Sequence, residues 1–194
     1  MKGEIVASTP SKETLKRVRK LEEIAPLLRE GKDFPVTRLT AIKSLCAEPG
    51  AAAAFALFLA HRIQSKMQQG QSPERYRELV DRAVKELRRY LTDATEERKE
   101  RLSSLCREME AEQNEYKKIG WDRVRILKSR GLVVVEQSLK SIVRSNEAGI
   151  WAYQAAKDYA ERYDSRYGTG LIPISAPMVE EIAEFWRKYY GIKE

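Results

Sequence analysis

Few side chains in this sequence have the types and spacing that could support chemistry. His61 is the only histidine, which excludes metal sites with paired histidines and leaves any base-activated serine or cysteine dependent on one ring. It follows the apolar run Ala51 to Ala60 directly. We therefore expect His61 to lie at the end of a core helix, near the boundary with water, rather than to bind a ligand or act in catalysis.

Three carboxylates recur at helical spacing. Glu108, Glu112 and Glu115 fall at i, i+4 and i+7, which places them on one helical face, as a site for a hard cation would require. No other segment shows matching carboxylates, so a solvated face is the favoured interpretation. Cys46 and Cys106 lie within apolar helical patterns without paired spacing, which is typical of reduced core thiols. The sequence predicts no catalytic residue, no metal and no cofactor.

Basic residues form the second group of candidates. The net charge is +7, and residues 1–92 hold 18 Lys and Arg against 11 Asp and Glu, whereas residues 93–194 hold 18 of each. Segment 117–130 surrounds Trp121 with cations that could meet phosphates while the indole stacks on a base. Its candidate nucleic-acid-binding residues are Lys117, Lys118, Arg123, Arg125, Lys128 and Arg130. Segment 12–20 is a second basic segment, diluted by glutamates.

Helical geometry weakens the first of these nucleic-acid hypotheses. Around a helix the cations of segment 117–130 spread over several directions, so a helix buried through Trp121 with solvated arginines is the favoured interpretation. Arg75, Arg82 and Arg89 recur every seven residues, a pattern that could form a stripe for an acidic partner. Intrahelical pairs such as Glu78 with Arg82 instead favour a solvated face there.

Aromatic residues crowd the last quarter of the chain, where nine of the sixteen lie between residues 151 and 190. They surround segment 167–177, which contains two glycines, two prolines and several apolar residues. Such a segment must be packed or covered. It could be a structural loop across the bundle, a protein-binding surface or the wall of a small-ligand pocket with Arg166 or His61 as polar groups. The candidate partner-binding residues are Tyr163, Arg166, Tyr167, Leu171, Ile172 and Trp186.

The elements that position these residues are helices, because apolar residues recur at intervals of three to four along most of the chain. A first helix is expected after a cap at Thr9, with a bend at Pro26. An alanine-rich helix from residue 51 is expected at the centre of the fold, since its small side chains allow close approach. Residues 76–91 carry the cleanest apolar stripe. Gly120 and Gly131 are read as interruptions, with a helix favoured beyond Gly131.

Fold class and location follow from this pattern. We predict a single all-α domain spanning residues 1–194, either an irregular helical bundle or stacked helical hairpins, with about eight helices. The longest apolar run has ten residues, about half of the roughly 20 that span a bilayer. No membrane span is therefore expected, and the absence of a signal peptide within Met1 to Pro10 predicts a cytoplasmic protein.

The resulting functional hypothesis is non-catalytic association with another macromolecule, preferably a protein or a second copy of this chain, through the aromatic C-terminal region. The alternative is RNA or DNA binding through the basic segments 117–130 and 12–20. A third hypothesis is an enzyme with a small-ligand pocket near the 167–177 loop. Testing any of these three hypotheses requires the arrangement of the helices in space.

Overall fold

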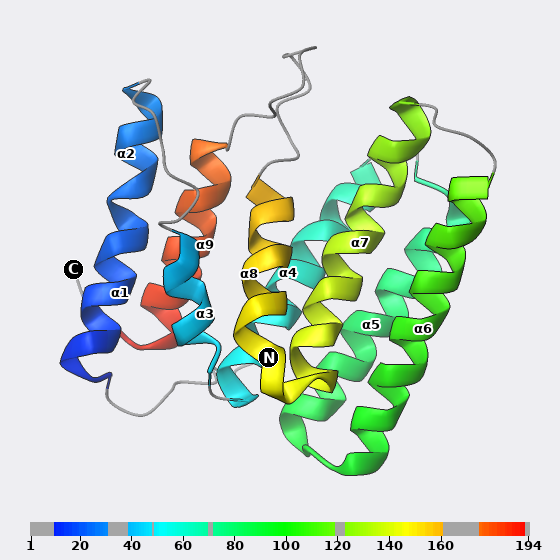
Figure 1. Cartoon of the computed structure of the whole chain (residues 1–194), viewed down its shortest axis with the longest axis horizontal. Coiled ribbons are helices and arrows are strands. Elements are labelled where there is room, and N and C mark those ends of the chain that lie inside the picture. Colours follow the sequence, from blue (N-terminus) through cyan, green and yellow to red (C-terminus); the bar gives the residue numbers. More distant parts are fainter. Residues whose placement is uncertain are drawn as a thin grey trace.

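Helices account for nearly all of the residues that the structure describes, and Figure 1 shows them as a computed structural model. The structure describes residues 10–30, 39–47, 49–69, 72–118, 123–160 and 175–192, without side-chain detail at residues 49, 116–118 and 123–130. Its elements are α1 (Lys12–Glu22), α2 (Ile24–Arg29), α3 (Ala41–Leu45), α4 (Pro49–Gln69), α5 (Glu74–Thr92), α6 (Glu96–Lys118), α7 (Arg123–Val143), the 3₁₀ helix η2 (Ser145–Glu147), α8 (Ala148–Ala160) and α9 (Ala176–Tyr189).

The first two helices are separated by the single residue Glu23. Ser11 caps α1, because its side-chain oxygen accepts a hydrogen bond from the backbone amide of Thr14 at 3.1 Å; the predicted cap at Thr9 lies outside the described residues. Pro26 lies inside α2 and has no N–H to offer the carbonyl of Glu22. The helix is interrupted at Glu23, three residues before the proline, and not at Pro26, where the sequence predicts a bend.

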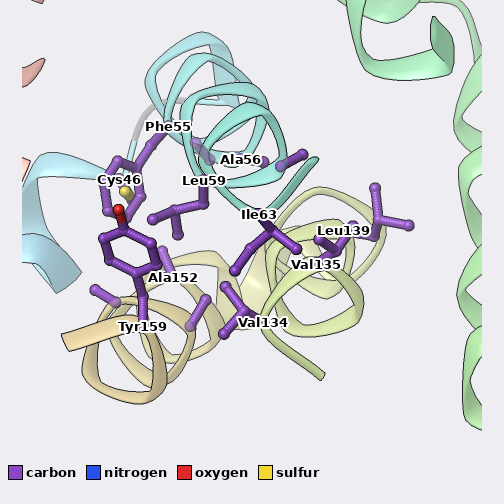
Figure 2. Close-up of a cluster of buried hydrophobic side chains, with 14 of the residues drawn as sticks. Cys46, Phe55, Ala56, Leu59, Ile63, Val134, Val135, Leu139, Ala152 and Tyr159 are labelled. Atoms are coloured by element: carbon purple, nitrogen blue, oxygen red, sulfur yellow. The ribbon is translucent and has the colours of Figure 1, made fainter. Parts of the chain in front are cut away.

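The alanine-rich helix α4 lies at the centre of the fold, as predicted. It packs against α5, α7 and α8, and every residue from Ala51 to Ala56 is buried. Figure 2 shows larger side chains of α4, including Leu59 and Ile63, among those of α7 and α8. Small residues let the helix axes approach, and the larger ones fill the space between them.

Helix α7 runs without a break through Gly131, so the predicted interruption at this glycine is wrong. A Cβ atom at Gly131 would lie 2.8 Å from Met67 Cε and 3.2 Å from Ile63 Cγ2. The glycine therefore marks a close approach of α4 to α7 and not a helix end. The expectation that the β-branched residues beyond it continue a helix is confirmed.

Helix α5 buries the apolar stripe that the sequence predicts. Its buried residues are Tyr76, Leu79, Val80, Ala83, Val84 and Leu87. Helix α6 follows after a short turn and packs against both α5 and α7. Its buried stripe is narrower and consists of Leu102, Leu105, Cys106 and Met109, which leaves much of α6 facing water, as expected.

The opposite edge of the molecule is built from α1, α2, α3 and α9 (Figure 1). Helix α9 packs against α1 and α2, while α3 packs against α1 and α8. The contact between α3 and α8 is very close, because a Cβ atom built on Gly149 would lie 2.2 Å from the carbonyl oxygen of Lys43. Only a glycine allows the two backbones to meet in this way.

The predicted fold class is confirmed. The described residues form an all-α structure without strands, and their helices pack in a single body around one continuous cluster of buried hydrophobic side chains. Cys46 and Cys106 are both buried and unbridged, as expected. Among the helices that the structure describes, none is long and apolar enough to cross a membrane.

Candidate functional site

The outer face of α8 combines exposed apolar and aromatic side chains. Ile150 has 57% of its surface exposed and is the only exposed large hydrophobic side chain among the described residues. Trp151 and Tyr153 are half-buried beside it. A helix turns by about 100° per residue, so these two aromatic residues flank Ile150 on either side. The opposite face of α8 is buried through five alanines and Tyr159.

Both aromatic rings of this α8 face are bordered by cations from neighbouring helices. Lys43 of α3 lies over Tyr153, with its Nζ 4.8 Å from the ring centroid. Lys140 and Arg144, at the end of α7, lie over Trp151 at 4.6 Å and 5.2 Å from its centroid. Cation–π contacts of this kind hold each ring in place and put positive charge at the border of the apolar surface.

Trp151 is also fixed by a hydrogen bond. Its indole Nε1–H donates to Oε2 of Glu147 at 2.8 Å, one turn earlier in the chain. Glu147 belongs to η2, the 3₁₀ turn that links α7 to α8. The aromatic side chain is thus held by two cations and at its polar edge before any partner arrives, which reduces the entropy lost when a partner covers it.

A charged cluster lies beneath Trp151, between α6 and α7. Lys140 Nζ forms an ion pair with Glu136 and a second one with Glu110 at 2.6 Å. Cys106 completes the cluster, with its Sγ–H 3.8 Å from Oε1 of Glu136. The Glu136 side chain is only 5% exposed, so its charge depends on Lys140 for compensation.

The pKa values of this cluster follow from burial and hydrogen bonding. Burial raises the pKa of Glu136 and raises that of Cys106 to about 12. The hydrogen bond from Lys140 lowers the pKa of Glu110. Burial opposes the charge on Lys140, yet its hydrogen bonds to the two carboxylates outweigh burial and raise its pKa. The lysine therefore stays charged and Cys106 stays a thiol at neutral pH.

The same cluster has the donor set of a metal site, because ligand atoms of Cys106, Glu110 and Glu136 lie within 4.8 Å of one another. Lys140 Nζ, however, already contacts both carboxylates and supplies the positive charge that a metal ion would bring. A protonated thiol is also a poor ligand. We therefore interpret the cluster as an ion triad that fixes α7 against α6 and carries Lys140 to the face of Trp151.

A second polar cluster lies where α4, α8 and α9 meet. The hydroxyl of Tyr159 donates to Oε2 of Glu181 at 2.5 Å, and Lys66 Nζ lies 3.3 Å from the same hydroxyl oxygen. Arg62 forms an ion pair with Glu181 at 3.4 Å. Burial lowers the pKa of Lys66, and the charge of Arg62 lowers it further against the opposite effect of Glu181. These contacts join the three helices beside the ends of segment 161–174.

Most of the predicted partner-binding residues fall in that segment. Tyr163, Arg166, Tyr167, Leu171 and Ile172 lie outside the described residues, so their role stays a prediction. The described residues on either side of the segment are joined, because the amide of Ser175 donates to the carbonyl of Ala160 at 3.0 Å. The predicted pocket near the 167–177 loop likewise stays a hypothesis.

Trp186 is a correction to the predicted partner surface. Its side chain is fully buried, with 0% exposure, and its ring stacks on Phe55 at 5.1 Å and on Tyr190 at 5.9 Å between centroids. The aromatic residues of α9 thus join α9 to α4 in the core. A buried indole cannot touch a partner, so Trp186 does not belong to an exposed surface. Sequence cannot distinguish the two roles, because both favour large aromatic side chains.

Of the basic segment 117–130, only the backbone of residues 117–118 and 123–130 is described. Lys117 and Lys118 end α6, and α7 begins at Arg123, but the structure does not describe these side chains or those of Arg125, Lys128 and Arg130. Nucleic-acid binding by this segment therefore stays a prediction.

The arginine stripe of α5 and the carboxylate face of α6 contact each other in the structure. Arg82 of α5 donates to both carboxylate oxygens of Glu108 of α6, at 2.6 Å and 2.9 Å. Arg75 lies 3.6 Å from Glu108 and 3.9 Å from Glu112. The hydrogen bond from Arg82 lowers the pKa of Glu108. The arginine stripe and the carboxylate face thus neutralise each other, which argues against both the acidic partner and the cation site.

His61 also has partners within the protein. Its Nδ1 lies 3.2 Å from Oε1 of Gln64 and its Nε2 lies 3.0 Å from a guanidinium nitrogen of Arg88. Burial and the charge of Arg88 lower the pKa of His61, against a weaker opposite effect of Gln64. The ring is therefore neutral at pH 7 and joins α4 to α5, in agreement with its predicted structural role.

Comparison with known proteins adds no assignment. No family model, no curated protein and no solved structure matches this chain. Function is therefore inferred from the side chains themselves. Among the described residues, the outer face of α8 is the surface whose composition best fits binding. Sequence analysis missed Ile150, although one signal was present: the alanines of α8 share one face, which places Ile150 on the other.

Proposed function

We propose that this protein acts by association with another protein, without catalysis, and that the outer face of α8 is the contact surface. The observation that carries this proposal is the exposure of Ile150 between two half-buried aromatic residues. Fully burying an isoleucine side chain stabilises a protein by roughly 1.5–3 kcal/mol, and about half of that stabilisation is forgone here because 57% of Ile150 is exposed. A partner that covers Ile150 would recover that stabilisation.

The composition of the surface supports a protein partner. Tryptophan, tyrosine and arginine are the residues that dominate binding energy at protein interfaces, and Trp151, Tyr153 and Arg144 surround Ile150 here. Lys43 borders Tyr153 and favours a partner with acidic groups at the rim of its own apolar surface, whereas Arg144, over Trp151, is paired with Glu147 at 4.0 Å. The α8 face is part of the aromatic C-terminal region to which the sequence points.

The α8 face is also held rigidly. Gly149 packs against the backbone of α3, and Glu147 and Lys140 hold Trp151. Preorganised side chains lose little freedom on binding, so more of their contact energy contributes to affinity.

The test compares the wild type with an Ile150→Asp variant in quantitative affinity capture, followed by titration with the purified partner. Ala94→Asp is the matched control, because Ala94 is exposed in the turn between α5 and α6 and the added charge is the same. We expect the control to retain the partner and Ile150→Asp to weaken binding by at least about tenfold, since hot-spot changes exceed about 1.4 kcal/mol.

Self-association is tested in parallel by sedimentation velocity of the same three proteins. A dimer that dissociates in Ile150→Asp but not in Ala94→Asp identifies a second copy of this chain as the partner. Equal binding and equal oligomeric state in all three proteins would refute the proposal.

A further inference from the structure

A separate surface, on helix α1, carries positive side chains without ion-pair partners among the described residues. Helix α1 buries Val18 and Leu21 against the core, and its opposite face is exposed. This outer face, which we call the α1 ridge, carries the cations Lys12, Lys16, Arg19 and Lys20, and the exposed Glu23 lies at its C-terminal end. At about 100° per residue the four cations fall within roughly a third of the helix circumference. Figure 1 shows α1 at an edge of the molecule.

The four cations of the α1 ridge have no ion-pair partner among the described residues. This distinguishes them from Arg17 on the same helix, which pairs with Glu13 at 3.4 Å. It also distinguishes them from Arg82, which pairs with Glu108 of the neighbouring helix. Elsewhere on this protein arginine is repeatedly matched with glutamate, whereas the α1 ridge leaves four positive charges to solvent. Like charges held on one face repel one another, so an anionic partner would stabilise them.

The spacing of the α1 ridge fits a row of phosphates. Lys12, Lys16 and Lys20 are four residues apart, which corresponds to about 6 Å of helix between neighbours and about 12 Å in all. One strand of a duplex carries a phosphate every 3.4 Å along its axis, so the ridge spans three or four of them. Lysine side chains reach phosphates as mobile point charges and do not read base edges.

We propose that the α1 ridge binds the phosphate backbone of nucleic acid without reading its sequence. This inference is independent of the proposed function, because the α1 ridge and the α8 face share no residue. Nucleic acid is favoured over a lipid surface for a structural reason. A membrane-binding amphipathic helix inserts its apolar face, whereas Val18 and Leu21 of α1 are 1% and 0% exposed within the core.

The test is fluorescence anisotropy of the full chain with a mixed-sequence DNA duplex and a mixed-sequence RNA strand at several salt concentrations. Four phosphate contacts predict a slope of log K against log salt of about −3.6 for the duplex. Affinity should then fall by about 150-fold between about 50 and 200 mM salt. Changing the base sequence should leave the affinity nearly unchanged.

The deciding variant is Lys16→Gln with Lys20→Gln, which removes two of the four charges. The slope should fall to about −1.8, so that the same change in salt costs only about 12-fold. The control is Arg77→Gln with Lys85→Gln on α5, because both residues are exposed and neither has an ion-pair partner among the described residues. The two variants have the same net charge, and the control should keep the wild-type slope.

Three results would overturn the proposal. Absence of binding at about 50 mM salt excludes a phosphate-binding surface of this strength. Equal weakening in both variants assigns the binding to net charge and not to the α1 ridge. Binding to phosphatidylserine vesicles, lost in the ridge variant, with no binding to either nucleic acid would assign the ridge to membranes. All substituted side chains are exposed, and circular dichroism verifies that each variant is folded.

Discussion

The close contact between α3 and α8 makes a specific prediction about Gly149. In Gly149→Ala the new Cβ atom would lie 2.2 Å from the carbonyl oxygen of Lys43 and 2.9 Å from both its carbonyl carbon and its Cα. These are backbone atoms, so no side-chain rotation relieves the clash and α3 must move away from α8. Overpacking of this kind costs about 1–3 kcal/mol, occasionally more.

An opposing effect reduces the expected loss. Alanine is favoured over glycine inside a helix by about 1 kcal/mol, and Gly149 lies in the first turn of α8. A clash at the upper end of the range leaves a net destabilisation of about 2 kcal/mol. For a chain of this length that corresponds to a fall in Tm of about 4–8 °C.

Two other glycines provide matched controls in the same assay. At Gly50 a Cβ atom would meet only Tyr189 Oη, at the ordinary distance of 3.9 Å, so Gly50→Ala should keep or slightly raise stability. At Gly131 the nearest atom is the flexible end of Met67, at 2.8 Å, so Gly131→Ala should give an intermediate result. The expected order of stability is Gly50→Ala, then Gly131→Ala, then Gly149→Ala.

The measurement is urea unfolding followed by circular dichroism, with the free energy of unfolding of each variant compared with that of the wild type. If Gly149→Ala proved as stable as Gly50→Ala, the close approach of α3 and α8 would be refuted. Since Ile150 follows Gly149 directly, the same variant should also weaken any partner binding through the α8 face.

Three further predictions concern charges and thiols. Lys140→Met should destabilise the protein by about 3 kcal/mol at neutral pH, because Glu136 is left buried and unpaired. Burial raises the pKa of Glu136 because it penalises the ionised form. This variant should therefore regain stability as the pH falls through that pKa. A loss of stability that is the same at about pH 5 and about pH 8 would contradict the ion triad. A double-mutant cycle on Arg82 and Glu108 should give a coupling free energy of about 0.5 kcal/mol that high salt removes, since both side chains are partly exposed. A larger coupling that does not depend on salt would contradict this exposure. Both cysteines should resist a thiol reagent at about pH 8 in the folded protein and react after unfolding, because burial raises their pKa values. Rapid labelling of Cys106 without unfolding would contradict its burial.

The elements with a strong apolar period could be predicted from the sequence. The stripe of α5 and the alanine-rich α4 are both confirmed, because each pattern is repeated over several turns and leaves one way to bury it. Gly131 shows where such reasoning ends. A glycine within a helical pattern has the same local signature whether it ends a helix or admits a neighbour, and only the position of Met67 and Ile63 decides between them.

The candidate site was less predictable than the fold. Trp186 was expected at a surface and is buried against Phe55, while Ile150 is exposed and was not singled out. Side-chain type sets how much a residue gains from burial, but the contacts made by other helices decide which residues obtain it. The triad of Glu110, Glu136 and Lys140 was missed for the same reason, since its members come from two helices.

The sequence by itself determined the secondary structure class, the buried faces of the longest helices and the absence of paired-histidine chemistry. These properties depend on side chains a few residues apart. The tertiary structure alone decided which charges meet, so that Arg82 is neutralised by Glu108 while Lys16 and Lys20 have no ion-pair partner among the described residues. It also decided that α8 presents Ile150 to solvent. Coulombic and packing energies depend on distances across the fold, and those distances exist only once the helices are assembled.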